Sequence, residues 1–330
     1  MKVIPMTQST AIQDARLLVQ AEFQAVDDLI IQNLESKVGL IQEVGQYLLQ
    51  AGGKRIRPLV LLLIAKACGH FNKHHLTLGA IIEFIHSATL LHDDVVDDSS
   101  KRRGKPSANR VWGNPTSVLV GDFLHSRAYQ MINSLRDFSL IDILAETINM
   151  LSEGEVVQLE HRKNPDLTET QYNWIIHCKT GTLFKAAGLL GAAYNENVAN
   201  QLILGEYGMH LGCAFQLMDD VMDYQSDPEV MGKNIGDDLK EGKMTLPLLY
   251  ALQKGTPAQA QIIRSSIQEA TLKDLSAIQD AIASTGAIEY TMEKAQAHAS
   301  AAISKLNVLS HSVYKTALIK LTNFSIRRAV

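Results

Sequence analysis

The chain has 330 residues, of which 46% are hydrophobic and 20% are charged, as in an ordinary folded globular protein. Its formal net charge of −4 gives no electrostatic reason to expect nucleic acid as a partner. The three cysteines, Cys68, Cys178 and Cys213, lie far apart without a C-x-x-C pair, so we expect buried small side chains in a reducing compartment.

Hydrophobic periodicity predicts helices along nearly the whole chain. Near the N-terminus, apolar residues recur at steps of three and four, as on one face of an amphipathic helix: Ile12, Ala15, Val19, Phe23, Val26 and Ile30. Comparable helical segments follow at 56–69, 75–98, 115–136, 138–162, 168–194 and 197–224, and again from about 244 onward. No stretch shows the sustained alternation of strands. The fold class is therefore all-α, with one domain over residues 1–330, or with a split near 195 or 240 as the alternative.

The sequence also bears on location. The first fifteen residues lack the continuous apolar stretch of a secretory signal. The clearest apolar run, 59–65, is too short to span a bilayer. We therefore expect a cytoplasmic protein without a transmembrane segment.

The first chemical signal is DDVVDDSSKRRGK at residues 93–105. Asp93 and Asp97 are four residues apart and share a helix face, as do Asp94 and Asp98. Like charges in that relation oppose helix formation, and a divalent cation with oxygen ligands would offset the repulsion. Arg102 and Arg103 follow directly, and guanidinium groups suit phosphate oxygens. The pattern indicates a metal–diphosphate site, with a solvated charged helix end as the alternative.

A second carboxylate cluster, DDVMD at 219–223, repeats the pattern at the end of another apolar helix. Asp219 and Asp223 have the same spacing as the first pair. Gln216 lies one turn before Asp220 and faces the same way, and Lys233 and Lys243 flank a further Asp pair. Two D-D-x-x-D patterns, one followed by R-R-G, are a strong joint signal.

Three weaker signals accompany these clusters. In GGKRIRP at 52–58, three cations lie within four residues, and the glycines permit close approach of the backbone to a ligand. His86 lies two turns before Asp93 on the same face, but alone it could equally be a hydrogen-bonded core histidine. Lys179 and Thr180 precede Gly181, where a local kink would free a backbone carbonyl.

With these motifs the chain resembles the all-trans polyprenyl diphosphate synthases, from about Asp14 to about Arg327. The marks are GGKRIRP, the 82–109 segment with its D-D-x-x-D and R-R-G, GDFLHSRA at 121–128, KTGTLF at 179–184, and the region from FQLMDDVMD to GKMTLPLL. The departures are Asp98, where relatives often carry Glu, and Ser100-Lys101 before the arginines. Neither departure touches a D-D-x-x-D or R-R-G position.

The resemblance implies an isoprenoid-synthase-type fold, a single bundle of long antiparallel helices around a deep central cavity, usually in a homodimer. It implies several Mg²⁺ ions per active site, held by Asp93, Asp97, Asp219 and Asp223. It places isopentenyl diphosphate on Lys54, Arg57, His86 and Arg103. It places the allylic prenyl diphosphate on Arg102, Lys179, Thr180, Gln216, Lys233 and Lys243. The residues expected to act in catalysis are Asp93, Asp97, Lys179, Thr180 and Asp219.

Product length is the most open point. Ala88 and Thr89, one turn before Asp93, are small, whereas short-chain relatives tend to carry an aromatic ring there. This favours a long product, most consistent with octaprenyl diphosphate made from a farnesyl primer for a quinone side chain, released with transient membrane contact. A geranylgeranyl synthase is the alternative within the family.

Three alternative functions fit the sequence less well than this activity. A terpene cyclase lacks the second D-D-x-x-D pattern, and a di-iron bundle needs a second E-x-x-H beside Glu83–His86. A non-catalytic subunit of a heterodimeric synthase would be expected to have lost carboxylates or the R-R-G, and both are intact.

Overall fold

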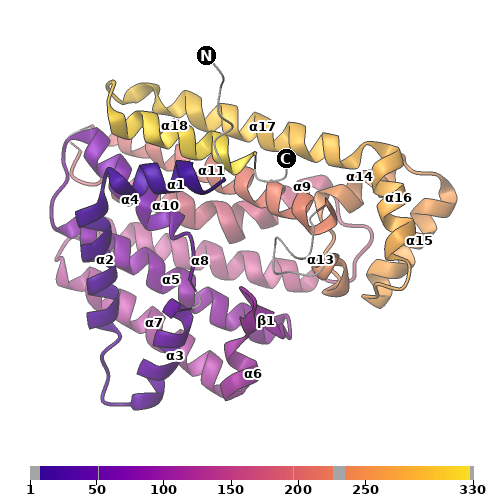
Figure 1. Ribbon diagram of the computed structural model, residues 1–330, viewed down its shortest axis with the longest axis horizontal. Coiled ribbons are helices and arrows are strands. Elements are labelled where there is room, and N and C mark those ends of the chain that lie inside the picture. Colours follow the sequence, from indigo (N-terminus) through magenta and orange to yellow (C-terminus); the bar gives the residue numbers. More distant parts are fainter. Residues whose placement is uncertain (1–7, 51, 196, 226–234, 328–330) are drawn as a thin grey trace. The chain divides into compact units, whose positions relative to one another are not determined.

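The computed structural model describes residues 8–50, 52–195, 197–225 and 235–327. Nearly all of the described secondary structure is helical (Figure 1). The chain forms two compact units. The first unit comprises Met1–Ile148, Leu183–Gly208 and Lys305–Leu321, and the second comprises Asn149–Thr182, Met209–Ser304 and Thr322–Val330. The all-α class is confirmed, whereas a single domain over residues 1–330 stays a prediction.

Most elements of the first unit come from the N-terminal half of the chain. They are α1 (Gln8–Leu17), α2 (Gln20–Asn33), α3 (Gly39–Gln50), α4 (Ile56–Cys68), α5 (His74–Val96), β1 (Lys101–Arg102), β2 (Lys105–Pro106), α6 (Ala108–Trp112), α7 (Asn114–Ser134) and the 3-10 turn η2 (Leu306–Val308). Nearly all of α10 (Thr182–Gly191) also belongs to it, as does the last residue of α17 (Ala287–Lys305), and three more helices are divided between the units: α8 (Phe138–Glu160), α11 (Val198–Gln225) and α18 (Val313–Ser325).

The second unit contains the remaining elements. They are α9 (Glu169–Ile176), the π-helical turn η1 (His177–Gly181), α13 (Asp237–Lys240), α14 (Leu246–Lys254), α15 (Pro257–Glu269), α16 (Leu275–Thr285) and all of α17 before Lys305. Thr168 and Thr256 begin α9 and α15 with capping boxes, because each threonine side chain accepts a hydrogen bond from the backbone three residues later.

The core of the first unit is built around α5, which packs against α2, α4 and α7. Every residue of α4 from Leu59 to Ala65 is fully buried. A helix that is apolar on all sides belongs in a protein interior, which accounts for the short apolar run in the sequence. Among the described residues, no helix combines the length and the apolar character needed to cross a membrane.

The N-terminal stripe forms two helices rather than one. The chain breaks at Val19, which has a φ of −133° and precedes α2. The apolar stripe itself is confirmed, because all six of its side chains are at most 9% exposed. Periodicity therefore located the buried face correctly and missed the break, since the apolar spacing continues across it.

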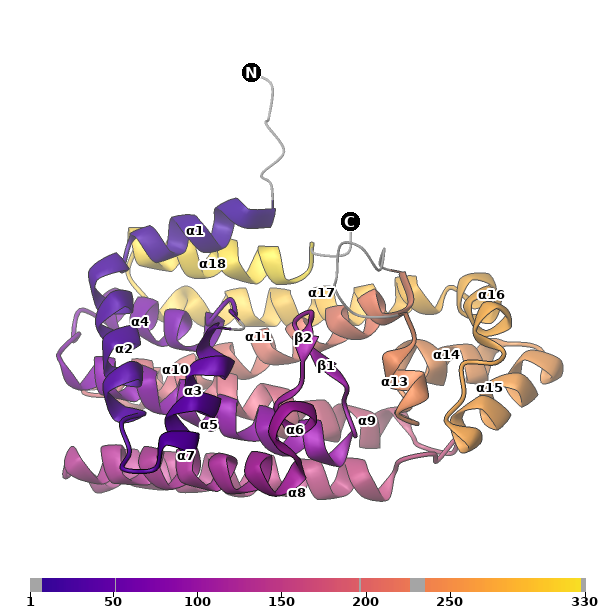
Figure 2. The same ribbon diagram turned by 60° about the horizontal axis from the view of Figure 1, so that its bottom comes forward.

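A small antiparallel hairpin interrupts the helices between α5 and α6, as Figure 2 shows. Lys101 pairs with Pro106, and Arg102 pairs with Lys105. Arg103 and Gly104 form the turn with φ values of +54° and +77°, and two positive φ values are typical of a two-residue hairpin turn. Strands of two residues leave no alternating pattern, so periodicity does not predict this hairpin, and the all-α class is unaffected.

Two glycines allow α10 and α11 to approach closely within the first unit. A Cβ atom built on Gly208 would lie 2.0 Å from the carbonyl oxygen of Phe184, and one built on Gly188 would lie 2.1 Å from that of Leu204. Both obstacles are backbone atoms, which cannot rotate away as a side chain can. Only glycine therefore fits at these two crossing points.

We predict that Gly208→Ala lowers the free energy of unfolding by about 1–3 kcal/mol, because the added methyl group must separate the helix backbones. Gly39→Ala is the matched control, since nothing lies within 4 Å of a Cβ at that helical position. Urea unfolding followed by circular dichroism measures both variants. Equal midpoints for Gly208→Ala and the wild-type protein would contradict the packing argument.

Candidate active site

The first acidic cluster lies at the C-terminal end of α5. Asp97 is the C-cap residue, and its backbone N–H donates to the Asp93 carbonyl at 2.8 Å, so the two carboxylates are one turn apart. Both side chains are partly exposed, whereas Asp94 is fully buried. Asp98 has a φ of +50° and pairs at the surface with Arg110. The shared face of Asp93 and Asp97 is thus as predicted, whereas Asp94 and Asp98 do not share an environment.

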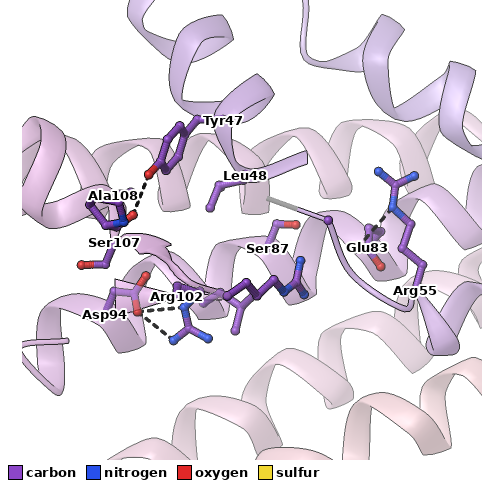
Figure 3. A pocket seen from close by; sticks show the side chains of 13 residues that line it. Tyr47, Leu48, Arg55, Glu83, Ser87, Asp94, Arg102, Ser107 and Ala108 are labelled. Carbon is purple, nitrogen blue, oxygen red and sulfur yellow. Dashed lines mark hydrogen bonds and ion pairs between the residues drawn. The ribbon is translucent and has the colours of Figure 1, made fainter. Parts of the chain in front are cut away.

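Asp94 holds Arg102 of the hairpin (Figure 3). Its Oδ1 atom accepts from Nε of Arg102 at 2.8 Å and lies 2.7 Å from the terminal Nη2. Asn109 donates its side-chain amide to the Asp94 backbone carbonyl at 2.9 Å. Burial works to lower the pKa of Arg102, but the Asp94 carboxylate outweighs it and raises the pKa, so the guanidinium stays charged.

The basic loop at Gly52–Arg57 meets the hairpin at Gly53. A Cβ built on Gly53 would lie 2.6 Å from Nη1 of Arg103, so the guanidinium rests directly on the glycine backbone. Arg57 lies over the Phe184 ring, with 4.6 Å between the guanidinium carbon and the ring centroid. The loop and the R-R-G turn, distant in sequence, therefore belong to one basic site.

A pocket of about 520 Å³, counting the space open to solvent, lies between these elements. Its lining combines charged groups of the loop, the hairpin and α5 with apolar groups of α3 and α6 (Figure 3). Charged lining residues are Arg55, Glu83, Asp94, Arg102 and Arg103, and apolar ones include Tyr47, Leu48, Leu90 and Ala108. An anion with an apolar body matches such a lining.

His86 and Glu83 lie on the α5 side of this site. Burial lowers the pKa of His86 well below its usual value, and the charges of Arg57, Arg103 and Arg102 lower it further. The imidazole is therefore neutral and can donate one N–H to a phosphate oxygen. Glu83 is 7% exposed among arginines, with Oε1 4.0 Å from Nε of Arg55. Burial raises the pKa of Glu83, and Arg55 and Arg57 oppose that effect.

The second acidic cluster, near the end of α11, repeats the arrangement of the first within the second unit. Asp219 and Asp223 are partly exposed, and Asp220 between them is 1% exposed. Oδ2 of Asp220 accepts from the Tyr172 hydroxyl at 2.5 Å, and Oδ1 accepts from the Gln216 amide at 2.8 Å. Burial, with the charge of Asp238, raises the pKa of Asp220 to about 8. In both D-D-x-x-D patterns the middle carboxylate is buried and the outer two remain accessible.

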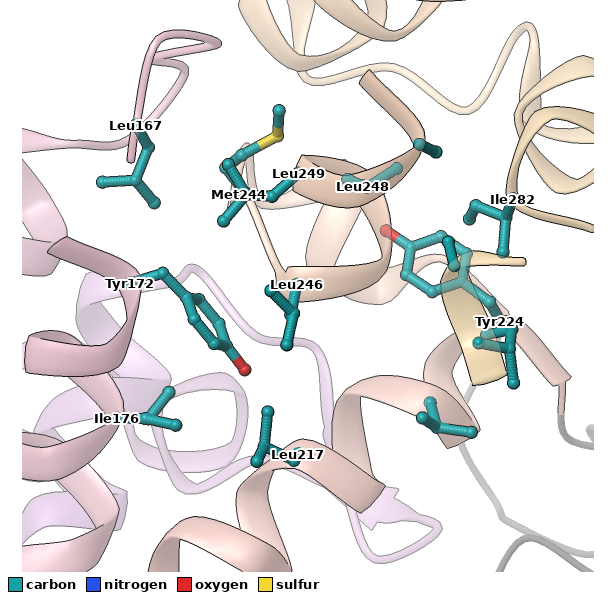
Figure 4. Packing of buried hydrophobic residues seen from close by; sticks show 14 of the residues in the cluster. Leu167, Tyr172, Ile176, Leu217, Tyr224, Met244, Leu246, Leu248, Leu249 and Ile282 are labelled. Atoms are coloured by element: carbon teal, nitrogen blue, oxygen red, sulfur yellow. The ribbon is translucent and has the colours of Figure 1, made fainter. Parts of the chain in front are cut away.

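The Tyr172 ring that supports Asp220 is itself fixed by apolar packing. Its labelled neighbours in Figure 4 are Ile176, Leu217 and Leu246, which belong to α9, α11 and α14. All are at most 5% exposed. The acidic end of α11 is therefore attached to a rigid apolar cluster rather than to a loop.

The Lys179-Thr180 pair lies in the π-helical turn η1, which confirms the local distortion expected beside Gly181. Such turns occur frequently at functional sites. Nζ of Lys179 donates to Glu155 and Gln158 of α8, at 2.7 Å in each case, and Thr180 donates to Oε1 of Gln216 at 2.8 Å. The structure thus joins the Lys-Thr motif to the second acidic cluster through Gln216.

A second pocket of about 630 Å³, again counting open space, contains this group. Of the predicted site residues, Lys179, Thr180, Gln216 and Lys243 line it, together with Tyr172, Asp220 and Asp238. Nζ of Lys243 lies 2.6 Å from Oε2 of Glu241. The backbone N–H of Asp238 donates to Oδ2 of Asp223 at 3.3 Å. Lys233 lies outside the described residues.

The partly exposed carboxylates match the chemistry of a magnesium ion. Each pair offers hard oxygen donors one helical turn apart, and Mg²⁺ is typically bound by one or two carboxylates plus substrate phosphates and water. In the described ranges, no three His, Cys, Asp or Glu side chains are grouped closely enough to hold a metal ion by themselves. The donor set therefore fits an ion that is completed by a phosphate ligand.

Sequence reasoning missed the groups that support the site. In the sequence, Glu83 stands out only as half of an E-x-x-H motif, and no pattern singles out Tyr172, Glu155 or Gln158. Burial of the middle aspartate could have been found, because adjacent helix residues point about 100° apart and cannot both face one ligand. The supporting residues left no such signal, since their roles depend on tertiary contacts.

The chain is similar to characterised proteins over nearly its full length. The family described as polyprenyl synthetase matches residues 38–284. Octaprenyl diphosphate synthase of Escherichia coli (strain K12) is 45% identical over 316 residues, covering 94% of this chain and 97% of the relative. All-trans-nonaprenyl-diphosphate synthase (geranyl-diphosphate specific) of Rhodobacter capsulatus is 42% identical, covering 96% and 98%.

Among solved structures, a polyprenyl synthase from Caulobacter crescentus CB15, complexed with calcium and isoprenyl diphosphate, has a TM-score of 0.93. It is 39% identical, and the alignment covers 99% of this chain and all of that one. These matches confirm the resemblance and the fold class that the sequence motifs indicated.

We predict that Asp94→Asn lowers the free energy of unfolding by about 2 kcal/mol, because a charged hydrogen bond to Arg102 is lost in a buried place. Asp98→Asn is the matched control, since Asp98 and Arg110 pair at 2.8 Å with side chains 78% and 46% exposed. Exposed pairs contribute about 0–1 kcal/mol. Urea unfolding measures both variants, and equal losses would show that Asp94 does not anchor the hairpin.

Proposed function

We propose, from the premise that the chain belongs to the polyprenyl synthetase family, that it is a long-chain all-trans polyprenyl diphosphate synthase. It would join isopentenyl diphosphate repeatedly to an allylic prenyl diphosphate. The observation that carries the proposal is the repeated site design. Each D-D-x-x-D helix end has two accessible outer carboxylates, and a cationic pocket belongs to the same unit.

Magnesium is the proposed cofactor, with Asp93 and Asp97 as ligands in one unit and Asp219 and Asp223 in the other. Bound there, the ions would supply positive charge to the diphosphate that leaves the allylic substrate. The relative from Caulobacter crescentus was solved with calcium and an isoprenyl diphosphate, which supports a divalent cation beside a diphosphate.

The two basic groups are proposed to hold different substrates. Isopentenyl diphosphate would bind Lys54, Arg57, His86 and Arg103, because the loop and the hairpin turn meet there. The allylic diphosphate would bind Arg102, Lys179, Thr180, Gln216, Lys233 and Lys243. Arg102 is already oriented by Asp94, and Lys179 by Glu155 and Gln158, so both cations are positioned before substrate arrives.

The chemistry follows from these charges. The bond between the allylic carbon and the diphosphate oxygen breaks, which leaves an allylic carbocation and inorganic diphosphate. The cationic side chains stabilise the negative charge that develops on the leaving group. The terminal alkene carbon of isopentenyl diphosphate attacks the cation, which forms the new carbon–carbon bond and leaves a tertiary cation. The carbon between that centre and the carbon that bears the diphosphate then loses a proton, and the new double bond forms. Released diphosphate is the proposed proton acceptor. The product of each cycle is one five-carbon unit longer than the allylic substrate.

Octaprenyl diphosphate, made from a farnesyl primer, is the proposed product. The Escherichia coli relative bears the name octaprenyl diphosphate synthase at 45% identity, and the Rhodobacter capsulatus relative is named for nonaprenyl. A quinone side chain is the proposed destination. The non-catalytic alternative is less favoured, since the described carboxylates and arginines are complete. The geranylgeranyl alternative is less favoured because Ala88 and Thr89 are small.

A cytoplasmic homodimer is the proposed form of the enzyme. In the first unit, α7 exposes Leu119 at 67% and Tyr129 at 40%, and large exposed apolar groups are common where copies associate. Transient membrane contact during product release remains part of the proposal, because a product of this length is strongly apolar.

We predict that the purified protein extends farnesyl diphosphate with labelled isopentenyl diphosphate to octaprenyl diphosphate. Thr89→Phe should shorten the dominant product, because Thr89 is partly exposed one turn before Asp93. The neighbouring Ala88 is fully buried, so a ring there would overpack the core instead. Chromatography of the dephosphorylated products measures chain length. A wild-type product no longer than geranylgeranyl would contradict the long-chain assignment.

We predict that Asp93→Ala and Asp219→Ala each reduce turnover in Mg²⁺ by about a thousandfold or more, because stabilisation of the leaving group is lost. Asp280→Ala, at an exposed position on α16, is the control and should retain wild-type turnover. Steady-state assays at saturating substrate and circular dichroism of each variant provide the measurement. Near-normal turnover of either variant would refute the proposed use of both acidic clusters.

A further inference from the structure

The basic loop before α4 adopts a backbone that needs outside support. Gly52 and Gly53 have φ values of +76° and +154°, and Arg55 has a φ of +39°. A positive φ is unfavourable for a residue with a side chain and persists where surrounding contacts hold it. The contacts that hold Arg55 and its neighbours therefore decide where the cations of this loop lie.

Arg16 of α1 makes one of these contacts. Its Nη2 atom donates to the backbone carbonyl of Lys54 at 2.7 Å and lies 3.5 Å from that of Gly53. The guanidinium carbon of Arg16 also lies 4.6 Å from the centroid of the Phe23 ring, so a cation–π contact helps to hold the Arg16 side chain in place. Arg16 thus holds the backbone of Lys54, the residue whose side chain is proposed to bind substrate.

Asp27 of α2 makes the second contact, because its carboxylate accepts from Nη1 of Arg55. Arg55 is also within 4.0 Å of Glu83 on α5. The helices that carry both contacts are firmly attached, since α1 and α2 each pack against α4. Val19 and Val26, on the same apolar stripe, are completely buried.

The same loop also contacts the proposed substrate site. Arg103 rests on Gly53, where even a Cβ would come within 2.6 Å of its guanidinium. The loop therefore contacts both Arg16, which fixes its backbone, and Arg103, whose guanidinium it supports. A shift of the loop at Gly53 and Lys54 would move the Lys54 ammonium and the Arg103 guanidinium away from a phosphate that both would bind.

We propose that Arg16, assisted by Asp27, is a positioning residue for the isopentenyl diphosphate site. This inference rests on the proposed function. Both residues precede the family match at 38–284, so the N-terminal helices complete a site whose substrate-binding side chains lie within the matched region. Arg16 acts through the Lys54 backbone and through the loop that supports Arg103.

The test compares Arg16→Ala, Arg16→Lys and a matched control, Glu22→Gln, in the full-length protein. Glu22 of α2 pairs with Lys66 of α4 at 2.5 Å, so its loss weakens attachment of the N-terminal helices without touching the loop. We expect Arg16→Ala to raise the KM for isopentenyl diphosphate about fivefold to tenfold, through loss of one charged hydrogen bond. The kcat and the allylic KM should stay within about twofold of wild type.

Arg16→Lys should recover part of the lost affinity, because an ammonium group can still donate to the Lys54 carbonyl. Glu22→Gln should leave both KM values unchanged even if it lowers the thermal midpoint. An unchanged KM for isopentenyl diphosphate in Arg16→Ala, or an equal rise in both KM values, would overturn the inference. If Arg16→Ala fails to fold, Asp27→Asn must raise the same KM selectively, and failure to do so would overturn the inference as well.

Calorimetry with inorganic diphosphate separates this inference from the proposed function. An inactive wild-type protein would refute the synthase proposal, while weaker binding of inorganic diphosphate by Arg16→Ala than by Glu22→Gln would still support the positioning role. An active wild-type protein whose Arg16→Ala variant has an unchanged KM for isopentenyl diphosphate and unchanged diphosphate affinity would refute the positioning role alone.

Discussion

Negative charge concentrated at the C-terminal ends of α5 and α11 is the constraint on which the sites depend. Carboxylates near a helix C-terminus oppose the helix dipole, and like charges one turn apart repel each other. The last turn of neither helix contains a basic residue that would offset this. Each helix instead turns its middle aspartate inward, where Asp94 binds Arg102 and Asp220 binds Tyr172 and Gln216. The outer carboxylates remain accessible, so a cation can neutralise them.

The groups around each acidic helix end follow from that arrangement. In the first unit, Asp94 orients Arg102, and the loop backbone at Gly53 supports Arg103, so two guanidinium groups are held in one pocket with Asp94. In the second unit, Gln216 links Asp220 to Thr180 within a pocket that Lys179 and Lys243 also line. A site that contains both carboxylates and cations suits a metal diphosphate, because the metal contacts the carboxylates and the phosphate oxygens contact the cations.

Sequence patterns predicted the parts of this account that depend on local spacing. The buried N-terminal stripe, the helix carrying each acidic cluster and the distortion at Gly181 were all expected, since periodicity and side-chain type determine them. The break at Val19, the two-residue strands, the partial exposure of Cys68 and the supporting roles of Glu83 and Tyr172 were not. These features arise from contacts between segments distant in sequence, which a single sequence does not display.

Thermal unfolding in the presence of Mg²⁺, inorganic diphosphate, or both tests the central claim most directly. If the outer carboxylates and a diphosphate bind the metal jointly, Mg²⁺ and inorganic diphosphate together should raise the unfolding midpoint by clearly more than the sum of their separate effects. A ligand present at about a hundred times its Kd contributes about 2.7 kcal/mol to the free energy of unfolding, which is large enough to measure. The doubly substituted Asp93→Ala, Asp219→Ala protein should lose this joint effect. A wild-type midpoint that both ligands together raise no further than each alone would contradict the account.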